Sequence, residues 1–177
     1  RCRSRCESDR FAPKLKCHEL TKSNRITPKC YNRTMETLDF TARFNFVGSE
    51  KDFEFHLIDN LEDISKSCGW GEIKRRERQF TIRQDKSRVI ADLMIWHTDG
   101  TGTIIECKKS NTNRNDVLAA IGQVLFYGAF VKSKMIHRPR LVIAAPSIPF
   151  TTYSVIQEFK LPINLLIVDG NKCTYLS

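Results

Sequence analysis

The sequence predicts an α/β protein, in which helices flank a mixed central β-sheet and a small basic, cysteine-rich arm precedes this core. Two observations lead to this prediction. Short apolar or β-branched runs alternate with segments of helical periodicity from about residue 49 onward. The length of 177 residues also suits one core of ordinary domain size with a small appendage. We therefore expect an arm over residues 1–35 and a folded domain over residues 36–177.

The predicted elements begin with a helix capped by Ser49, whose apolar stripe contains Phe53, Leu57, Leu61 and Ile64. Gly69 is expected to end a helical turn in the left-handed conformation. Alternating or continuous apolar runs predict strands at 72–84, 88–96, 103–107, 141–145, 164–168 and 172–176. Further helices are expected at 115–132 and 152–159.

The second and third predicted strands form a hairpin, because turn-forming residues lie between them. If the loop is centred on Gly100, Asp92 lies opposite Lys108 and Met94 lies opposite Glu106. Side chains alternate along a strand, so Asp92, Glu106 and Lys108 share one face. Isolated charges resist burial, so these three groups beside apolar runs either pair with one another or hold a cation.

The two carboxylates of this hairpin suit a hard divalent cation. Oxygen atoms of Asp92 and Glu106 are the ligands that Mg²⁺ or Mn²⁺ prefers, and the backbone carbonyl of Cys107 could add another. Such an ion activates water and neutralises charge on a phosphodiester, while Lys108 could orient or deprotonate the water. The alternative interpretation is an ordinary cross-strand ion pair.

The order of Asp92 and the Glu106-Cys107-Lys108 segment resembles the PD-(D/E)XK nuclease superfamily. Ala91 stands where the family's proline precedes the aspartate. The resemblance covers about residues 49–145 and implies a restriction-endonuclease-like core. It also implies that Asp92 and Glu106 bind the metal ion and that Lys108 assists the attacking water.

Two flanking helices extend the resemblance. Gln123 and Tyr127 lie four residues apart on one helix face, and they resemble the Gln-x-x-x-Tyr motif of the RecB-like branch, whose side chains lie near the metal and the nucleic-acid backbone. The alternative is a buried helix whose polar residue bonds a neighbouring strand. In the family an acidic residue of the first helix often joins the metal shell; Glu50 matches this position best, and Glu54 is its rival.

The resemblance implies a Mg²⁺- or Mn²⁺-dependent endonuclease that hydrolyses DNA, either at specific sites or at particular structures. An RNA-directed nuclease and a non-cleaving nucleic-acid-binding module on the same fold are the alternatives. A homodimer could form through the helix around Leu118, Leu125 and Phe130. No apolar run reaches the roughly 20 residues that span a bilayer, and no signal peptide is evident, so we expect a soluble, intracellular protein.

The arm carries most of the net charge of +9. Residues 1–33 hold ten Lys or Arg against three acidic residues, which leaves +7 in this segment. Such a segment suits a polyanionic partner, and we expect DNA, with RNA as the alternative. Its four cysteines could hold a structural zinc ion, or they could be free thiols: Cys2, Cys6, Cys17 and Cys30. The remaining cysteines, scattered along the domain, are interpreted as structural: Cys68, Cys107 and Cys173.

Overall fold

The computed structural model describes residues 46 and 48–177, apart from 85–86, 110–113, 132–136 and 171. The N-terminal arm, with its four predicted zinc ligands, lies outside these residues. The predicted domain boundary near residue 35 lies outside them as well.

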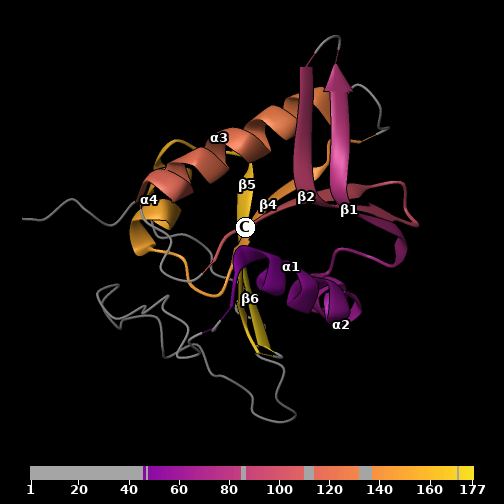
Figure 1. Ribbon diagram of the computed structural model, residues 1–177, viewed down its shortest axis with the longest axis horizontal. Helices are drawn as coiled ribbons and strands as arrows, with labels where there is room; N and C mark the ends of the chain where they lie inside the picture. The colour runs from indigo at the N-terminus through magenta and orange to yellow at the C-terminus, as the bar shows by residue number, and fades with distance from the viewer. Residues whose placement is uncertain (1–45, 47, 85–86, 110–113, 132–136, 171) are drawn as a thin grey trace, which may run out of the picture.

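A mixed six-stranded sheet forms the centre of the molecule, with its strands in sequential order across the sheet (Figure 1). The three central strands β3, β4 and β5 are parallel, and all other neighbours are antiparallel. The predicted α/β class is confirmed. The strands are β1 (Ile73–Gln84), β2 (Ser87–His97), β3 (Gly102–Cys107), β4 (Arg140–Ala145), β5 (Ile163–Asp169) and β6 (Lys172–Leu176).

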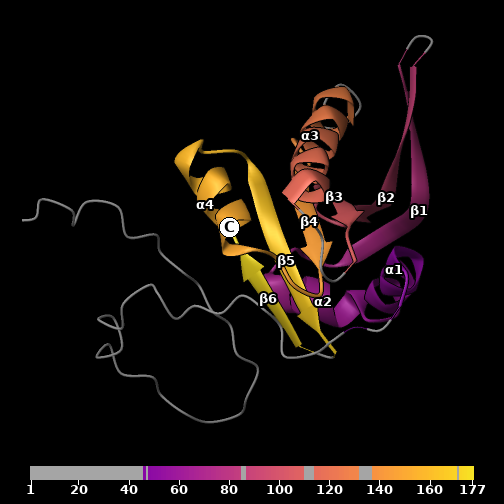
Figure 2. The ribbon, with the colours of Figure 1, turned by 60° about the vertical axis from the view of Figure 1, so that its left-hand side comes forward.

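In the described part of the chain, four helices cover the two faces of the sheet. Helices α1 (Glu50–Asp59) and α2 (Leu61–Cys68) lie on one face, and α3 (Arg114–Val131) and α4 (Phe150–Glu158) lie on the other (Figure 2). The alternation of strand side chains produces two apolar cores. On β4, for example, Ile143 faces the α3 side, whereas Val142 faces the α1 side.

The predicted first helix is divided in two. Its start is as expected, because Ser49 caps α1 and forms a capping box with Asp52. The helix then breaks at Asn60, whose side-chain amide donates to the carbonyl of His56 at 2.8 Å. All four residues of the predicted apolar stripe are nevertheless buried. The second helix ends at Gly69, which has the expected left-handed conformation with φ 65°.

The β2–β3 hairpin forms, but its predicted register is wrong by two residues. Leu93 pairs with Ile105 and Met94 with Ile104, so the loop is centred on Asp99 rather than on Gly100. The Asp99 carboxylate accepts the backbone N–H of Thr101 at 2.9 Å and closes a tighter loop than we expected. Because a shift of two residues preserves the faces of a strand, Glu106 remains on the side predicted for it.

The alternation of β2 changes phase at Asp92. Ala91 and Met94 are three residues apart, yet both contribute to the core on the α3 side. From Asp92 toward the β1–β2 turn, β1 and β2 extend past the sheet as a two-stranded ribbon (Figures 1 and 2). Gln79 of β1, opposite this segment, has a positive φ of 49°. A sharp local twist of the ribbon therefore occurs at Asp92.

Helix α3 leaves some apolar side chains at the surface. Leu118 is 49% exposed, whereas Leu125 and Phe130 pack against the core. The homodimer predicted through these three residues stays a prediction. In the part of the chain that the structure describes, no helix is long and apolar enough to cross a membrane.

Candidate active site

The predicted site lies at the carboxyl end of β3, where this strand runs parallel to β4. Ligands commonly bind outside the carboxyl ends of parallel strands. The backbone N–H of Cys107 donates to Oδ2 of Asp92 at 2.8 Å, and the backbone N–H of Lys108 donates to the carbonyl of Ala144 at 2.8 Å. Asp92 therefore connects the twist of β2 to the end of β3 through its side chain.

Glu106, Lys108 and Glu50 form one chain of charges. The ammonium nitrogen of Lys108 lies 2.6 Å from Oε1 of Glu106 and 3.8 Å from Oε1 of Glu50. The Glu106 side chain is almost fully buried, whereas that of Glu50 is 46% exposed. Helix α1 thus brings its first residue near the end of β3, while the role predicted for Glu50 as a metal ligand stays a prediction.

The second carboxylate oxygen of Glu106 is buried and makes no hydrogen bond of good geometry with any described residue; the Tyr127 hydroxyl lies close to this carboxyl group but donates to Ile90. Burial is the main cause that raises the pKa of Glu106 to about 7, and the nearby charge of Asp92 adds to it, against the opposing effect of Lys108. Burial also raises the pKa of Asp92, although the hydrogen bond from Cys107 opposes this shift. The site therefore holds two carboxyl groups that ionise reluctantly in the metal-free protein.

Lys108 keeps its proton in this arrangement. Burial alone would lower the pKa of Lys108, but its hydrogen bond with Glu106 and the charges of Glu106, Glu50 and Asp92 together raise it. In this state the side chain is an ammonium donor rather than a base.

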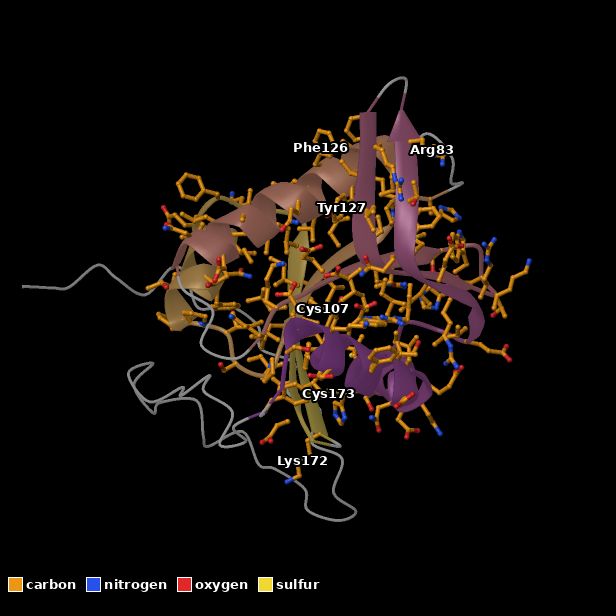
Figure 3. The ribbon with its side chains drawn as sticks, viewed as in Figure 1. Arg83, Cys107, Phe126, Tyr127, Lys172 and Cys173 are labelled. Carbon is orange, nitrogen blue, oxygen red and sulfur yellow. The ribbon has the colours of Figure 1, made fainter. Side chains whose placement is uncertain are left out.

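Tyr127 and Gln123 of α3 lie behind the carboxylates. The hydroxyl of Tyr127 donates to the backbone carbonyl of Ile90 at 2.9 Å, and Gln123 reaches this hydroxyl only at 3.5 Å. Burial first, and then the charges of Glu106 and Asp92, raises the pKa of Tyr127. Tyr127 therefore joins α3 to β2 near the site, and Figure 3 shows it above Cys107. Gln123 makes its described contact with Tyr127 rather than with a carboxylate.

The carboxylate of Glu54, the alternative to Glu50 as the acidic ligand from the first helix, already has hydrogen-bond partners. Its Oε1 accepts from Nε of Arg78 at 2.8 Å, and its Oε2 accepts from Nε2 of Gln79 at 3.3 Å. The Gln79 amide also lies 3.3 Å from Oδ1 of Asp92, so it bridges the two carboxylates. Among the residues that the structure describes, Glu50 has no comparable neutralising partner besides Lys108.

Sequence reasoning missed the role of Gln79. The β1–β2 register places this residue opposite Asp92, since Arg78 pairs with Leu93 and Phe80 with Ala91. The position of Gln79 directly after a strongly charged run was the available signal. The positive φ of Gln79 leaves no mark in the sequence.

His56 turns away from the carboxylates. Its Nε2 lies 3.0 Å from the carbonyl oxygen of Gly170, so the ring fastens α1 to the β5–β6 turn. Within the described residues, no three or more His, Cys, Asp or Glu side chains are close enough together to hold a metal ion as a ready-made cage. Asp92 and Glu106 approach one another with the Lys108 ammonium beside them.

The arginines of β1 are largely paired with acids. Arg75 pairs with Glu77 and stacks on the ring of Trp96, with 4.6 Å between the guanidinium carbon and the ring centroid. Arg78 pairs with Glu54, as described above. By contrast, Arg83 and Arg88 face one another directly across the ribbon, and both are exposed. Among the described residues neither has an acidic partner, so repulsion between them is uncompensated there.

Comparison with known proteins finds only remote similarity. The sequence matches no protein-family model and no curated protein. Among solved structures, a repair endonuclease from Pyrococcus abyssi is similar with a TM-score of 0.49 and 17% sequence identity, over 71% of this chain and 49% of that one. Can2 from Sulfobacillus thermosulfidooxidans, in complex with cyclic tetra-adenylate, is similar with a TM-score of 0.47 and 15% identity, over 67% of this chain and 32% of that one.

The chain spans about half the length of the first of these proteins and about a third of the second. Likenesses this remote do not carry an activity from one protein to another. The side chains at the end of β3 are therefore the basis for inferring function.

Proposed function

We propose that this protein is a metal-dependent nuclease that hydrolyses phosphodiester bonds of DNA at the carboxyl end of β3. The observation that carries the proposal is the unpaired Oε2 of Glu106, a buried carboxylate oxygen next to Asp92. A buried oxygen without a partner costs free energy unless something binds it. The charge and chemistry of this oxygen suit a cation.

The surrounding groups fit Mg²⁺ or Mn²⁺. Asp92 and Glu106 offer hard carboxylate oxygens, the backbone carbonyl of Cys107 directly follows Glu106 in the chain, and Glu50 stands at the exposed side of the site. Mg²⁺ commonly uses only one or two protein carboxylates and takes its remaining ligands from water and substrate phosphate. A ready-made cage of three acidic residues is therefore not required. When bound, the ion would activate water and offset charge on the phosphodiester.

Lys108 contributes as a cation in this proposal. Its raised pKa keeps the ammonium protonated near neutral pH, so it donates hydrogen bonds to an oxygen of the phosphodiester or orients the attacking water. The sequence also allowed Lys108 to act as the base. The hydrogen bond to Glu106 argues against that second role.

The protruding ribbon gives the substrate a place to bind. Arg83 lies on the part of β1 beyond the sheet, away from Cys107 (Figure 3), and Arg88 is its cross-strand partner. Two exposed guanidinium groups side by side attract an anion between them, and a nucleic-acid backbone supplies such anions. We place the duplex or strand along this ribbon, with the scissile phosphate at Glu106.

The test is cleavage of supercoiled, single-stranded and branched DNA, and of RNA, with Mg²⁺, Mn²⁺ or EDTA. Glu106→Gln keeps the side-chain shape and removes the charge, and we expect at least a roughly 100-fold loss of rate. Glu62→Gln on the exposed side of α2 is the matched control and should retain full activity. Binding without metal-dependent cleavage of any substrate would leave the non-cleaving module as the correct interpretation. Cleavage of RNA but not of DNA would show that the substrate is RNA.

A further inference from the structure

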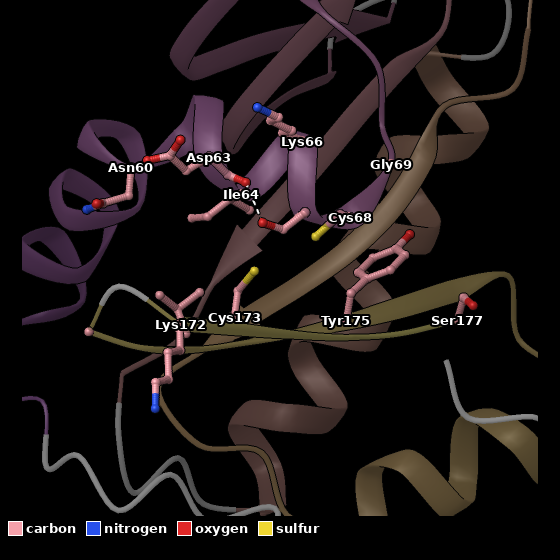
Figure 4. Close-up of a pocket in the computed structure, with 13 residues that line it drawn as sticks. Asn60, Asp63, Ile64, Lys66, Cys68, Gly69, Lys172, Cys173, Tyr175 and Ser177 are labelled. Atoms are coloured by element: carbon pink, nitrogen blue, oxygen red, sulfur yellow. Dashed lines mark hydrogen bonds between the residues drawn. The ribbon is translucent and has the colours of Figure 1, made fainter. Parts of the chain in front are cut away.

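Two cysteines far apart in the sequence lie near one another where α2 meets β6, at a distance along the helix layer from the carboxylates. Cys68 is the last residue of α2, and Cys173 lies on the edge strand β6. Their thiols are hydrogen-bonded to one another, and their sulfur atoms point toward each other in Figure 4. Both line a cavity of about 940 Å³ between α2 and the β5–β6 hairpin. Neither cysteine is fully buried.

The two thiols are not equivalent. Cys68 occupies the carboxyl end of a helix, where the helix dipole disfavours a negative charge. Cys173 lies on a strand and has no such penalty. The hydrogen bond with Cys68, and then one with Ser67, lower the pKa of Cys173 against the effect of burial, whereas the hydrogen bond with Cys173 and burial raise the pKa of Cys68. Lys66 and Lys172 also line the cavity, but their ammonium groups point away from the sulfurs, so they are not the cause (Figure 4).

A third thiol in the domain provides a contrast. Cys107 is fully buried in the core on the same side of the sheet. Burial raises the pKa of this thiol. Thiolate character and access both govern the reactivity of a cysteine. Cys107 has neither thiolate character nor access to solvent, whereas Cys173 has both.

We propose that Cys68 and Cys173 are a redox modification site that reacts with a hydroperoxide and closes to a disulfide between α2 and β6. The Cys173 thiolate attacks one peroxide oxygen, the O–O bond breaks, and Cys173 becomes a sulfenic acid while water or an alcohol leaves with one proton. The sulfur of Cys68, after losing its proton, then attacks the sulfur of Cys173. The S–O bond breaks and the oxygen leaves as water. Two thiols lose two electrons and two protons, and the peroxide gains them.

The disulfide would fix the helix layer that carries Glu50. In the reduced protein, the hydrogen bond between His56 and the carbonyl of Gly170 already ties α1 to the β5–β6 turn. A bond from Cys68 to Cys173 would tie the far end of α2 to the same hairpin. Because it joins distant parts of the chain, the disulfide would also restrict the unfolded state strongly.

The test uses the reduced 177-residue protein, which is treated at neutral pH with hydrogen peroxide, quenched with N-ethylmaleimide and digested with trypsin. We expect a dithiothreitol-sensitive species that joins peptide Ser67–Lys74 to the peptide beginning at Cys173, lighter than the two separate peptides by two hydrogen atoms. The oxidised protein should melt at a higher temperature than the reduced protein. Peptide mapping separates this linkage from any that involves cysteines of the N-terminal arm.

Single substitutions distinguish the roles of the two thiols. Cys68→Ser should leave a sulfenic acid at Cys173 that dimedone traps, whereas Cys173→Ser should leave Cys68 largely unreacted. Cys107 is the internal control and should stay reduced in the native protein. Peroxide-treated wild-type protein without the linked peptide would overturn the proposal, and this outcome does not depend on the variants folding. Oxidation of Cys107 as fast as of Cys173 would overturn it as well.

Discussion

The ammonium group of Lys108 lies 2.6 Å from one carboxylate oxygen of Glu106 and leaves the other oxygen of that carboxylate buried and unpaired. One oxygen of the Glu106 carboxylate is therefore paired with a cation of the protein itself, and the other oxygen is left for another cation. The energetic and functional consequences of this arrangement can be measured.

The first prediction concerns stability without metal. The pKa of Glu106 rises from an ordinary 4.5 to about 7 on folding, so between these values the folded state holds more protons than the unfolded state. The free energy of unfolding should therefore fall as pH rises through this window, by up to about 1.4 kcal/mol per pH unit from this group. Urea denaturation in EDTA should show that Glu106→Gln removes this slope. An unchanged slope in the variant would contradict the assignment of the raised pKa.

The second prediction concerns metal affinity. A divalent ion needs Glu106 ionised, and a pKa of about 7 makes protons compete with the metal near neutrality. We expect Mg²⁺ to bind about tenfold more weakly at pH 6 than at pH 8, as measured by calorimetry. Glu62→Gln should show the same pH dependence as the wild type. Equal affinities at the two pH values would contradict a role for Glu106 in metal binding.

The third prediction separates the role of Lys108 from that of the carboxylates. Lys108→Met removes the ammonium from Glu106 but leaves both acidic residues in place. Cleavage should fall by about 100-fold or more, since a positioned charge is lost. Binding of Mg²⁺ at pH 8.5 should persist, because the competing cation is gone. Loss of metal binding together with activity would instead indicate that Lys108 only maintains the structure.

The fourth prediction concerns Gln79. Its side-chain amide bridges Glu54 and Asp92, and its backbone has a positive φ. Gln79→Ala and Gln79→Gly both remove the amide, so both should lower the cleavage rate through loss of Asp92 positioning. Only glycine relieves the backbone strain, so Gln79→Gly should be more stable than Gln79→Ala by about 1 kcal/mol. Thermal denaturation measures this difference. Equal stabilities would indicate that the strain is absent in solution.

The fifth prediction concerns the ribbon. Substitution of both Arg83 and Arg88 by alanine should weaken DNA binding and reduce the slope of log affinity against log salt by about 2. Cleavage of saturating DNA in a single turnover should change little, because these residues lie away from Glu106. Arg75→Ala is the matched control, since Arg75 already pairs with Glu77. It should affect the salt slope less than either ribbon arginine does.

Local sequence patterns predicted the helices and strands well. They predicted less about the site, because the site depends on contacts between segments far apart in the chain. Period-two alternation placed Glu106 on the correct face of β3, although the Asp99 carboxylate shortened the loop and shifted the register. The apolar stripe of the first helix was visible, but the stripe continues through Asn60, so it did not mark the break there, where the Asn60 side chain bonds the carbonyl of His56.

Contacts between elements that are far apart in the chain left no comparable pattern in the sequence. The neutralisation of Glu54 by Arg78 joins a helix to a strand and could not be read from spacing. The meeting of Cys68 and Cys173 depends on how α2 lies over β6, and the sequence showed only scattered cysteines. The assignment of a metal to the carboxylates remains a prediction.

The position of β1 at the edge of the sheet has a consequence for the behaviour of the protein in solution. An edge strand presents unpaired backbone groups to which a strand of another molecule could add. The charged side chains along β1, including Arg75 and Arg76, oppose such addition, because an identical strand would bring like charges together. Replacing them with uncharged β-formers would therefore remove a barrier to edge-to-edge aggregation.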